Sequence, residues 1–283
     1  MKLFKTVSGI FLQTENKTFR IDGDWDTLVN RDDLHDYLKN HSEKGTAADV
    51  GPDEKEILAP LGSQEIWAAG VTYLKSRDAR MEESHTSGGS DLYDRVYEAE
   101  RPELFFKATA QRVADPGAEV YIRRDSDWNV PEPELTLFIS SSGKIQGYTI
   151  GNDMSSRSIE GENALYLPQA KVYEKCAAIG PCLYVPQQIF PGENGIHLRI
   201  TRGGKEMYAD STPVSRMKRK FDELAGFLFR ECDFPNGAYL MTGTCLVPPS
   251  DFTLNAGDVV EISIDGIGTL VNTVAYNPKH KNG

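Results

Sequence analysis

Three pairs of strand-like segments dominate the second half of the chain, and they constrain its fold more than any other feature. In each pair, two runs rich in alternating apolar residues flank a short turn that contains glycine. The pairs are residues 134–140 and 144–152, residues 196–202 and 205–210, and residues 258–265 and 268–276. Glycine tolerates the backbone angles that tight hairpin turns require. The pattern therefore predicts three β-hairpins.

Helical patterns are few by comparison. Residues 75–86 and 91–100 have helical composition and are separated by Ser87-Gly88-Gly89-Ser90. A long amphipathic helix is expected to begin at Pro213, with Thr212 as its cap, because proline suits the first helical position. Few helices beside long hairpins predict an α+β fold that is built on a curled, mixed sheet.

The first part of the chain forms a pattern of its own. Strand-like runs flank Ser8-Gly9, and a polar helical stretch follows, with Asp32 or Asp33 as its expected N-cap. The polar, glycine-containing residues 42–51 are a candidate linker. We therefore expect a small N-terminal domain over residues 1–62 and a main domain over residues 63–283.

Charge and cysteine usage narrow the classes of partner. The net charge is -11, whereas nucleic acids and anionic membranes select clustered cations. The one dense basic run comprises Arg216, Lys218, Arg219 and Lys220, and we expect it to be a solvated helix face. The four cysteines form no C-x-x-C pair, so neither a zinc site nor a disulfide framework is expected. The chain begins without a leader-like pattern and lacks a run of about 18 apolar residues, so we expect a cytoplasmic protein.

A cluster of acidic residues carries the strongest chemical signal. Glu132 and Glu134 alternate with Pro131 and Pro133, and a period of two points both glutamates to one side of a strand. The prolines lack backbone donors, which indicates an edge strand or a strand entrance. The returning strand ends at Asp153, beside the glutamates. Three carboxylates suit Mg²⁺, Mn²⁺ or Ca²⁺. On spacing alone, a solvent-facing acidic edge and an unrelated turn remain the alternative.

Several motifs, in a fitting order and spacing, resemble the catalytic domain of the fumarylacetoacetate hydrolase family from about Ile66 to Val274. They are GVTY (70–73), PELFFKAT (102–109), PEPEL (131–135), GYTIGNDMSSRSIE (147–160), QAKVY with Lys171, AIGP (178–181), GT (243–244) and the GDVVEISIDGIGTLVNTV segment. The resemblance implies a mixed β-roll. It also implies a divalent cation, usually Mg²⁺, held by Glu132, Glu134 and Asp153.

One position separates two branches of that family. Hydrolytic members carry a water-activating histidine three residues after the tyrosine of GxxY, and this chain has Ser76 there. Serine without a partner is no general base near neutral pH. None of the five histidines lies in a matching motif, and His85, the nearest, is expected to be a surface residue. The remaining motifs are similar to dehydratases of 2-keto-3-deoxy-pentonates, such as the D-arabinonate and D-xylonate derivatives, which form 2,5-dioxopentanoate and water.

Dehydration assigns roles to further residues. A 2-keto acid can chelate a cation, and the reaction needs a base at C3 and an acid at the C4 hydroxyl. Glu103, Lys171 and Glu132 are the candidates for this proton transfer, with their individual roles left open. Substrate contacts are expected from Lys171, Thr244 and Lys107. Lys107 could equally pair with an acid, Glu103 and Lys171 could be solvated, and Thr244 could be a turn residue.

Other functions remain open from the sequence. The same residues could serve an acylpyruvate or diketo-acid hydrolase or decarboxylase, whereas the intact acidic triad argues against a non-catalytic metabolite sensor. Arg157 is expected to orient the metal carboxylates by a salt bridge. Residues near 77–92 are expected to close over the site as a lid. The family resemblance also implies a homodimer or homotetramer, with a small 2-keto acid as the ligand.

Overall fold

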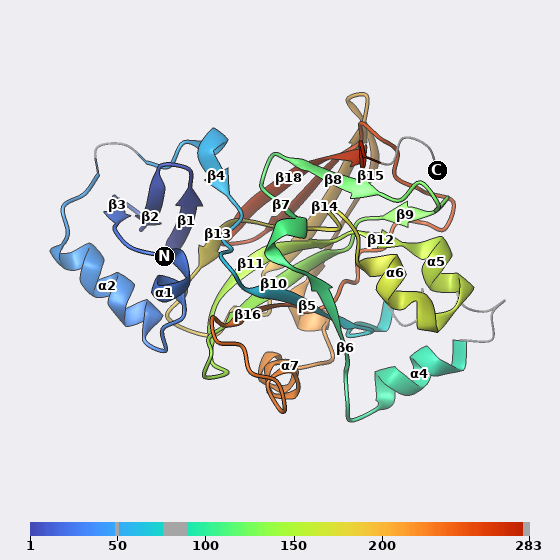
Figure 1. The fold of residues 1–283 in the computed structure, drawn as a ribbon, viewed down its shortest axis with the longest axis horizontal. Coiled ribbons are helices and arrows are strands. Elements are labelled where there is room, and N and C mark those ends of the chain that lie inside the picture. Colours follow the sequence, from blue (N-terminus) through green and yellow to red (C-terminus); the bar gives the residue numbers. More distant parts are fainter. Residues whose placement is uncertain (49–50, 76–89, 280–283) are drawn as a thin grey trace.

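The computed structural model of the chain describes residues 1–48, 51–75 and 90–279, and it is built around two β-sheets (Figure 1). The larger sheet contains eleven strands. Its main path is β3 (Thr18–Ile21), β2 (Gly9–Gln13), β1 (Lys2–Thr6), β13 (Ala177–Tyr184), β11 (Ile145–Asp153), β10 (Pro133–Ile139), β16 (Ala238–Met241), β5 (Glu65–Gly70) and β6 (Glu103–Ala108). The short strands β4 (Ile57–Leu58) and β7 (Val113–Ala114) pair with β1 and β13.

A second sheet of five strands packs on one face of the larger one. Its order is β15 (Lys205–Pro213), β14 (Gly195–Arg202), β17 (Val259–Ile264), β18 (Gly268–Tyr276) and β8 (Glu119–Ile122). Leucines of β10 and isoleucines of β14 and β17 share one buried apolar cluster between the sheets. All seven residues of β10 are buried, so this strand is covered on both faces. Buried apolar area of this kind is the main source of folding free energy.

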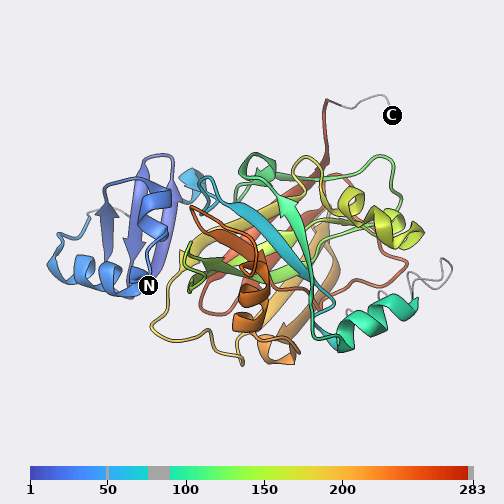
Figure 2. The same cartoon turned by 60° about the horizontal axis from the view of Figure 1, so that its bottom comes forward.

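The helices lie at the periphery of the sheets. They are α1 (Trp25–Val29), α2 (Leu34–Lys44), α4 (Ser90–Glu98), α5 (Arg157–Glu162), α6 (Leu167–Lys171) and α7 (Phe221–Leu228), with short 3₁₀ turns at Glu54–Glu56, Ala110–Arg112, Ala164–Tyr166 and Val214–Arg216. Figure 2 shows the N-terminal unit at one end of the molecule and α4, α5 and α6 at the other. In the part of the chain that the structure describes, no helix is long and apolar enough to cross a membrane.

The three predicted hairpins are confirmed. β10 pairs with β11, β14 with β15, and β17 with β18, each pair antiparallel and joined by the expected turn. The N-terminal hairpin at Ser8-Gly9 is confirmed too, since β1 pairs with β2. The helix predicted near residues 91–100 is also confirmed, as α4. The α+β class and the mixed sheet follow from these elements.

The predicted helix start at Pro213 is wrong. Thr212 and Pro213 are the last residues of β15, opposite Ile196 and Gly195, and α7 begins only at Phe221. Strand pairing outweighed the local helix signal, since proline is tolerated at the end of an edge strand. The basic run therefore precedes the helix.

The interpretation of that basic run as a solvated face is also wrong for one of its members. Arg219 is buried and donates to the carbonyl oxygens of Val96, Ala99 and Glu100, so it holds the end of α4. The rest of the run is exposed apart from the intervening Met217. A guanidinium has five donors in a rigid fork, which explains why an arginine can satisfy several carbonyls at one helix end.

Two further expectations need adjustment. Pro133 begins β10, as a strand entrance would, but β10 lies between β11 and β16 and is no edge strand. Asp33 precedes α2 without a capping hydrogen bond from its side chain, while Asp32 binds Ser140, Ser142 and Lys144 instead. The expected lid, the helix over residues 75–86, Ser76 and His85 fall almost entirely outside the described residues. The division of the chain at residue 62 stays a prediction.

Candidate metal centre

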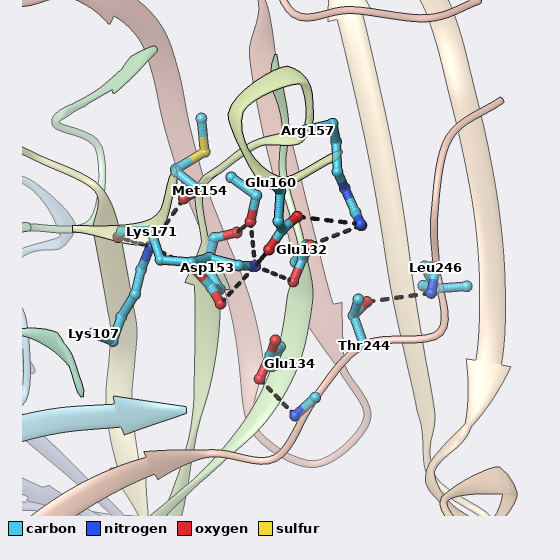
Figure 3. Close-up of polar contacts among 12 residues, drawn as sticks. Lys107, Glu132, Glu134, Asp153, Met154, Arg157, Glu160, Lys171, Thr244 and Leu246 are labelled. Carbon is cyan, nitrogen blue, oxygen red and sulfur yellow. Dashed lines mark hydrogen bonds and ion pairs between the residues drawn. The ribbon is translucent and has the colours of Figure 1, made fainter. Parts of the chain in front are cut away.

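The β10–β11 ladder brings Glu132, Glu134 and Asp153 together. Glu134 lies opposite Gly151 in the antiparallel register, and the Asp153 amide donates to the Glu132 carbonyl at 2.9 Å. The three side chains are buried, and carboxylate oxygens of all three lie within 4.8 Å of one another. The sequence alternation thus places three negative charges in one enclosed space (Figure 3).

The environment of Glu134 opposes its ionisation. Burial raises the pKa of Glu134 well above its usual value, and the neighbouring charges of Asp153 and Glu132 raise it further. One compensating contact comes from the Gly243 amide, which donates to Glu134 Oε2 at 2.6 Å. Gly243 has a φ of 96°, and a Cβ there would lie 2.0 Å from Thr72 Oγ1. Glycine is therefore required for this donor to reach the carboxylate.

Lys171, at the end of α6, is a cation that contacts two of these carboxylates. Its Nζ lies 2.8 Å from Glu132 Oε2, 3.1 Å from Asp153 Oδ2 and 2.6 Å from Ser155 Oγ. The Lys171 side chain is fully buried, and the Phe105 ring centroid lies 5.7 Å from its Nζ. Burial makes each of these contacts electrostatically strong. The alternative of a solvated Lys171 is wrong.

β6 contributes a second buried cation. Lys107 Nζ lies 2.5 Å from Asp153 Oδ1 and donates to the carbonyls of Met154 and Lys171. Of the two readings left open for Lys107, the pairing with an acid is the one observed. Glu103 and Phe105 alternate along β6 and therefore face the same side, whereas Lys107 lies where the pairing of β6 with β5 shifts register. Glu103 is partly buried, and Gly70 makes room for it, since a Cβ there would lie 1.9 Å from Glu103 Oε2.

α5 adds a pair of charged residues, of which the sequence pattern singled out only one. Arg157 Nη2 lies 2.7 Å from Glu132 Oε1, as expected for a residue that orients a metal carboxylate. Glu160 was missed, although it is only 2% exposed and lies 3.5 Å from Arg157 and 3.7 Å from Lys171. Their i, i+3 spacing on a helix was the available signal, because such residues share a face.

Thr244 lies at the opposite side of the cluster, directly after the glycine that binds Glu134. It is buried, and its hydroxyl accepts from the Leu246 amide at 3.2 Å. Figure 3 shows Thr244 beyond Glu134 and Glu132, on the side away from Lys107. Its hydroxyl proton is left to donate to a ligand, because the observed bond uses the oxygen only as acceptor.

The donor set fits a hard divalent cation. Mg²⁺ prefers oxygen ligands, and three converging carboxylates offer them at one point. Burial and then the charges of Asp153 and Glu132 raise the pKa of Glu134, and Lys171 and the Gly243 amide offset this rise only in part. Glu132, Glu134 and Asp153 are thus the residues that would hold the cation. Arg157, Lys107 and Lys171 contact oxygens of Glu132 and Asp153 and orient these two carboxylates.

Comparison with known proteins gives a consistent result. A family model described as fumarylacetoacetate (FAA) hydrolase C-terminal matches residues 66–275. The chain is 50% identical over 231 residues to a probable 2-keto-3-deoxyxylonate dehydratase of Haloferax volcanii, covering 80% of this chain and 78% of that protein. It is 37% identical to a 2-dehydro-3-deoxy-D-arabinonate dehydratase of Saccharolobus solfataricus, over 99% of this chain and 98% of the relative.

A solved structure is similar over almost the same length. It is a 2-keto-3-deoxy-D-arabinonate dehydratase complexed with magnesium and 2,5-dioxopentanoate. The TM-score is 0.83 at 34% sequence identity, and the match covers 98% of this chain and 99% of the other.

Proposed function

The chain belongs to the fumarylacetoacetate hydrolase family, and we propose that it is a metal-dependent dehydratase of 2-keto-3-deoxy-pentonates. The substrate would be a compound such as 2-keto-3-deoxy-D-arabinonate or -xylonate, and the products would be 2,5-dioxopentanoate and water. Two relatives named as such dehydratases support the proposal, as does the magnesium complex of a similar enzyme. The observation that carries it is the buried group of three carboxylates with Lys171 bonded to two of them.

The cofactor in this proposal is Mg²⁺, held by Glu132, Glu134 and Asp153. When bound, such a cation supplies Lewis acidity to the carboxylate and keto oxygens of a 2-keto acid, which makes the C3 protons more acidic. Water is lost when a proton leaves C3 and the hydroxyl leaves C4 with a proton. The resulting C3–C4 double bond moves to C4–C5 when a proton leaves C5 and another is returned to C3. The enol formed in this way becomes the aldehyde when its C5 hydroxyl loses a proton and C4 gains one. Each of these steps needs a group that can hold or deliver a proton.

Three residues are our candidates for that proton transfer. Lys171 Nζ is buried and can bind a negative substrate oxygen or pass a proton at that atom. Glu103 shares the β6 face of Phe105 and is half-buried. Glu132 is the third candidate, although Arg157 and Lys171 hold both its oxygens. Thr244 and Lys107 are proposed substrate contacts, and Lys107 would act mainly through Asp153.

The quaternary structure and compartment complete the proposal. We infer a homodimer or homotetramer that works in the cytoplasm. None of the four cysteines is in a disulfide, which agrees with a reducing compartment.

The test is a substrate panel for the purified chain. The panel contains 2-keto-3-deoxy derivatives of D-arabinonate, D-xylonate and L-arabinonate, together with acylpyruvates, each with Mg²⁺ and with a chelator. We expect aldehyde formation from at least one sugar acid, dependent on Mg²⁺ and abolished in Asp153→Asn. Cleavage of the acylpyruvates without aldehyde formation from any sugar acid would establish the hydrolase alternative instead.

A further inference from the structure

Two buried bridges join Lys171 to Asp153. In the first bridge, Lys107 Nζ lies 2.5 Å from Asp153 Oδ1 and donates to the Lys171 carbonyl. In the second bridge, Ser155 Oγ donates to the Asp153 carbonyl at 2.9 Å and lies 2.6 Å from Lys171 Nζ. All four residues are buried. The first bridge therefore fixes the backbone at the end of α6, and the second contacts the tip of the Lys171 side chain.

The Ser155 hydroxyl acts as an acceptor for Lys171, because its own proton is in use. A serine hydroxyl has one proton and two lone pairs. The proton is donated to the Asp153 carbonyl, so the oxygen accepts from the ammonium. β12 (Ser155–Ser156) holds this oxygen in place by pairing with β9 (Asn129–Val130), which leads directly to the two glutamates of the centre. The acceptor is thus built on the strands beside the metal ligands.

Ser155 differs in kind from two other partners of Lys171. Lys171 Nζ also contacts Glu132 Oε2 and Asp153 Oδ2, and both carboxylates belong to the set that would hold the cation. A bound cation would compete with the ammonium for the negative charge of these carboxylates. The serine hydroxyl is neutral and lies outside the carboxylate set, so its contact with Lys171 does not depend on that charge.

We infer that Ser155 is a positioning residue that holds the Lys171 ammonium in place when a cation is bound by the three carboxylates. The inference rests on the proposed function, because it takes Lys171 as a group that acts on the substrate. The alternative is a purely structural role, in which Ser155 supports Asp153 through its carbonyl. In the first case the effect of removing the hydroxyl depends on Lys171, and in the second case it does not.

A double-mutant cycle between Ser155 and Lys171 tests this dependence. Ser155→Ala removes the hydroxyl and should lower kcat by about tenfold or more, the scale of one hydrogen bond to a charged group. In the Lys171→Met background there is no ammonium to position, so the same substitution should change kcat by less than about twofold. Mg²⁺ affinity, measured by calorimetry, should change less than kcat, because Ser155→Ala removes no carboxylate.

The neighbouring serine of the same strand provides a matched control. Ser156 is also buried, and its hydroxyl donates to Ser126 Oγ at 2.8 Å and caps α5. Any effect of Ser156→Ala should therefore be the same factor with and without the Lys171 ammonium. Lys171→Gln is a second background for the cycle, and the Tm with a chelator shows which variants are folded.

Two results would overturn the inference. One is a loss in Ser155→Ala that is the same factor in both backgrounds, which is the signature of support for Asp153 alone. A weaker affinity for Mg²⁺ would accompany that result. The other is an unchanged kcat in Ser155→Ala.

The inference and the proposed function can fail separately. If a sugar acid is dehydrated, the cycle in kcat tests Ser155 alone. If none is dehydrated, the proposed reaction is wrong, and the cycle is read in the affinity for 2-oxopentanoate with Mg²⁺, since this 2-keto acid has no C4 hydroxyl. A loss of that affinity that requires Lys171 supports the inference, whereas an equal loss in both backgrounds, or no loss, overturns it. A wild type that neither dehydrates a sugar acid nor binds 2-oxopentanoate contradicts both.

Discussion

Lys171 Nζ lies 2.8 Å from Glu132 Oε2, and both side chains are almost fully removed from solvent. The ammonium reaches this carboxylate from α6, whereas the glutamate directly precedes β10, so the pair joins a helix to the central sheet. Removing one partner of a buried ion pair leaves the other charge without compensation, which costs far more than losing a surface pair. The contact therefore makes the geometry of the metal centre sensitive to single substitutions.

The first prediction concerns Lys171→Met, which removes the charge and keeps much of the volume. We expect a loss of about 10²-fold or more in kcat, because Lys171 is a proposed proton-transfer group, and a higher KM, because its proposed charged contact to substrate is lost. Steady-state kinetics with the active sugar acid measure both. Lys144→Met, at an exposed lysine that pairs with Asp32, is the control and should change neither. A higher KM with an unchanged kcat would restrict Lys171 to substrate binding.

The second prediction concerns Glu103→Gln. The substitution should leave Mg²⁺ binding unchanged, because Glu103 is not among the converging carboxylates, and should lower turnover by about 10²-fold or more. Metal affinity by calorimetry and kcat by aldehyde formation separate the two effects. Glu100→Gln, at an exposed glutamate three residues earlier, is the matched control. Full activity in Glu103→Gln would leave Lys171 and Glu132 as the proton-transfer candidates.

The third prediction is a pH dependence that originates in Glu134. Burial and neighbouring carboxylates raise the pKa of Glu134, so the folded chain without a cation retains a proton that the unfolded chain releases near pH ~4.3. This contribution to stability is complete below the unfolded pKa and is lost as the pH rises through the higher folded pKa. Mg²⁺ would compensate the negative charge that Glu134 then carries.

The gain in Tm on adding Mg²⁺ should therefore be larger at about pH 8 than at about pH 5.5. Thermal unfolding with Mg²⁺ and with a chelator measures this gain at each pH. In Glu134→Gln, the gain in Tm at about pH 8 should exceed the gain at about pH 5.5 by less than in the wild type, because the glutamine amide does not titrate. A gain in the wild type that is the same at both pH values would contradict the prediction.

Arg219 and Arg216 provide the fourth prediction. Arg219→Ala removes the charged hydrogen bonds to the carbonyls at the end of α4 and should lower the free energy of unfolding by about 2 to 3 kcal/mol. Hydrogen exchange in α4 should rise by more than the global change explains. Arg216→Ala is the control from the same basic run, where the side chain is exposed, and should stay within about 0.5 kcal/mol of the wild type. Equal effects of both variants would mean that Arg219 contributes only its charge.

The sequence predicted local elements of the fold better than contacts between distant elements. Alternating apolar residues around glycine turns predicted the paired strands, because hairpins are local and their turn residues are visible. The contacts of Arg219 with α4 were not predictable, since the carbonyl oxygens that it binds lie more than 100 residues away in the sequence and depend on how α4 packs. Thr212 and Pro213 carried a helix signal that strand pairing with β14 overrode.

The candidate site likewise contains residues that the sequence predicted and one that it did not. The strand period of two predicted that Glu132 and Glu134 lie on one side, and the return strand of the hairpin predicted Asp153 beside them. The family motifs added Lys171, Glu103 and Thr244. Glu160 was hidden because a glutamate on a short polar helix is normally solvated. Its burial results from two cations that reach it from α5 itself and from the end of α6.

The joining of the N-terminal strands to the central sheet has a consequence for how the molecule melts. β1 pairs with β13, β13 with β11, and β11 with β10, so residues 2–21 share one hydrogen-bonded ladder with the strands that carry Asp153 and Glu134. The N-terminal unit cannot detach without baring an edge of β13 and the apolar cluster that both parts complete. We expect a single calorimetric transition with equal van't Hoff and calorimetric enthalpies. Under that cooperativity, a cavity made at Leu12 in β2 should lower the temperature at which the centre is lost and a bound cation is released, although no atom of β2 belongs to the centre.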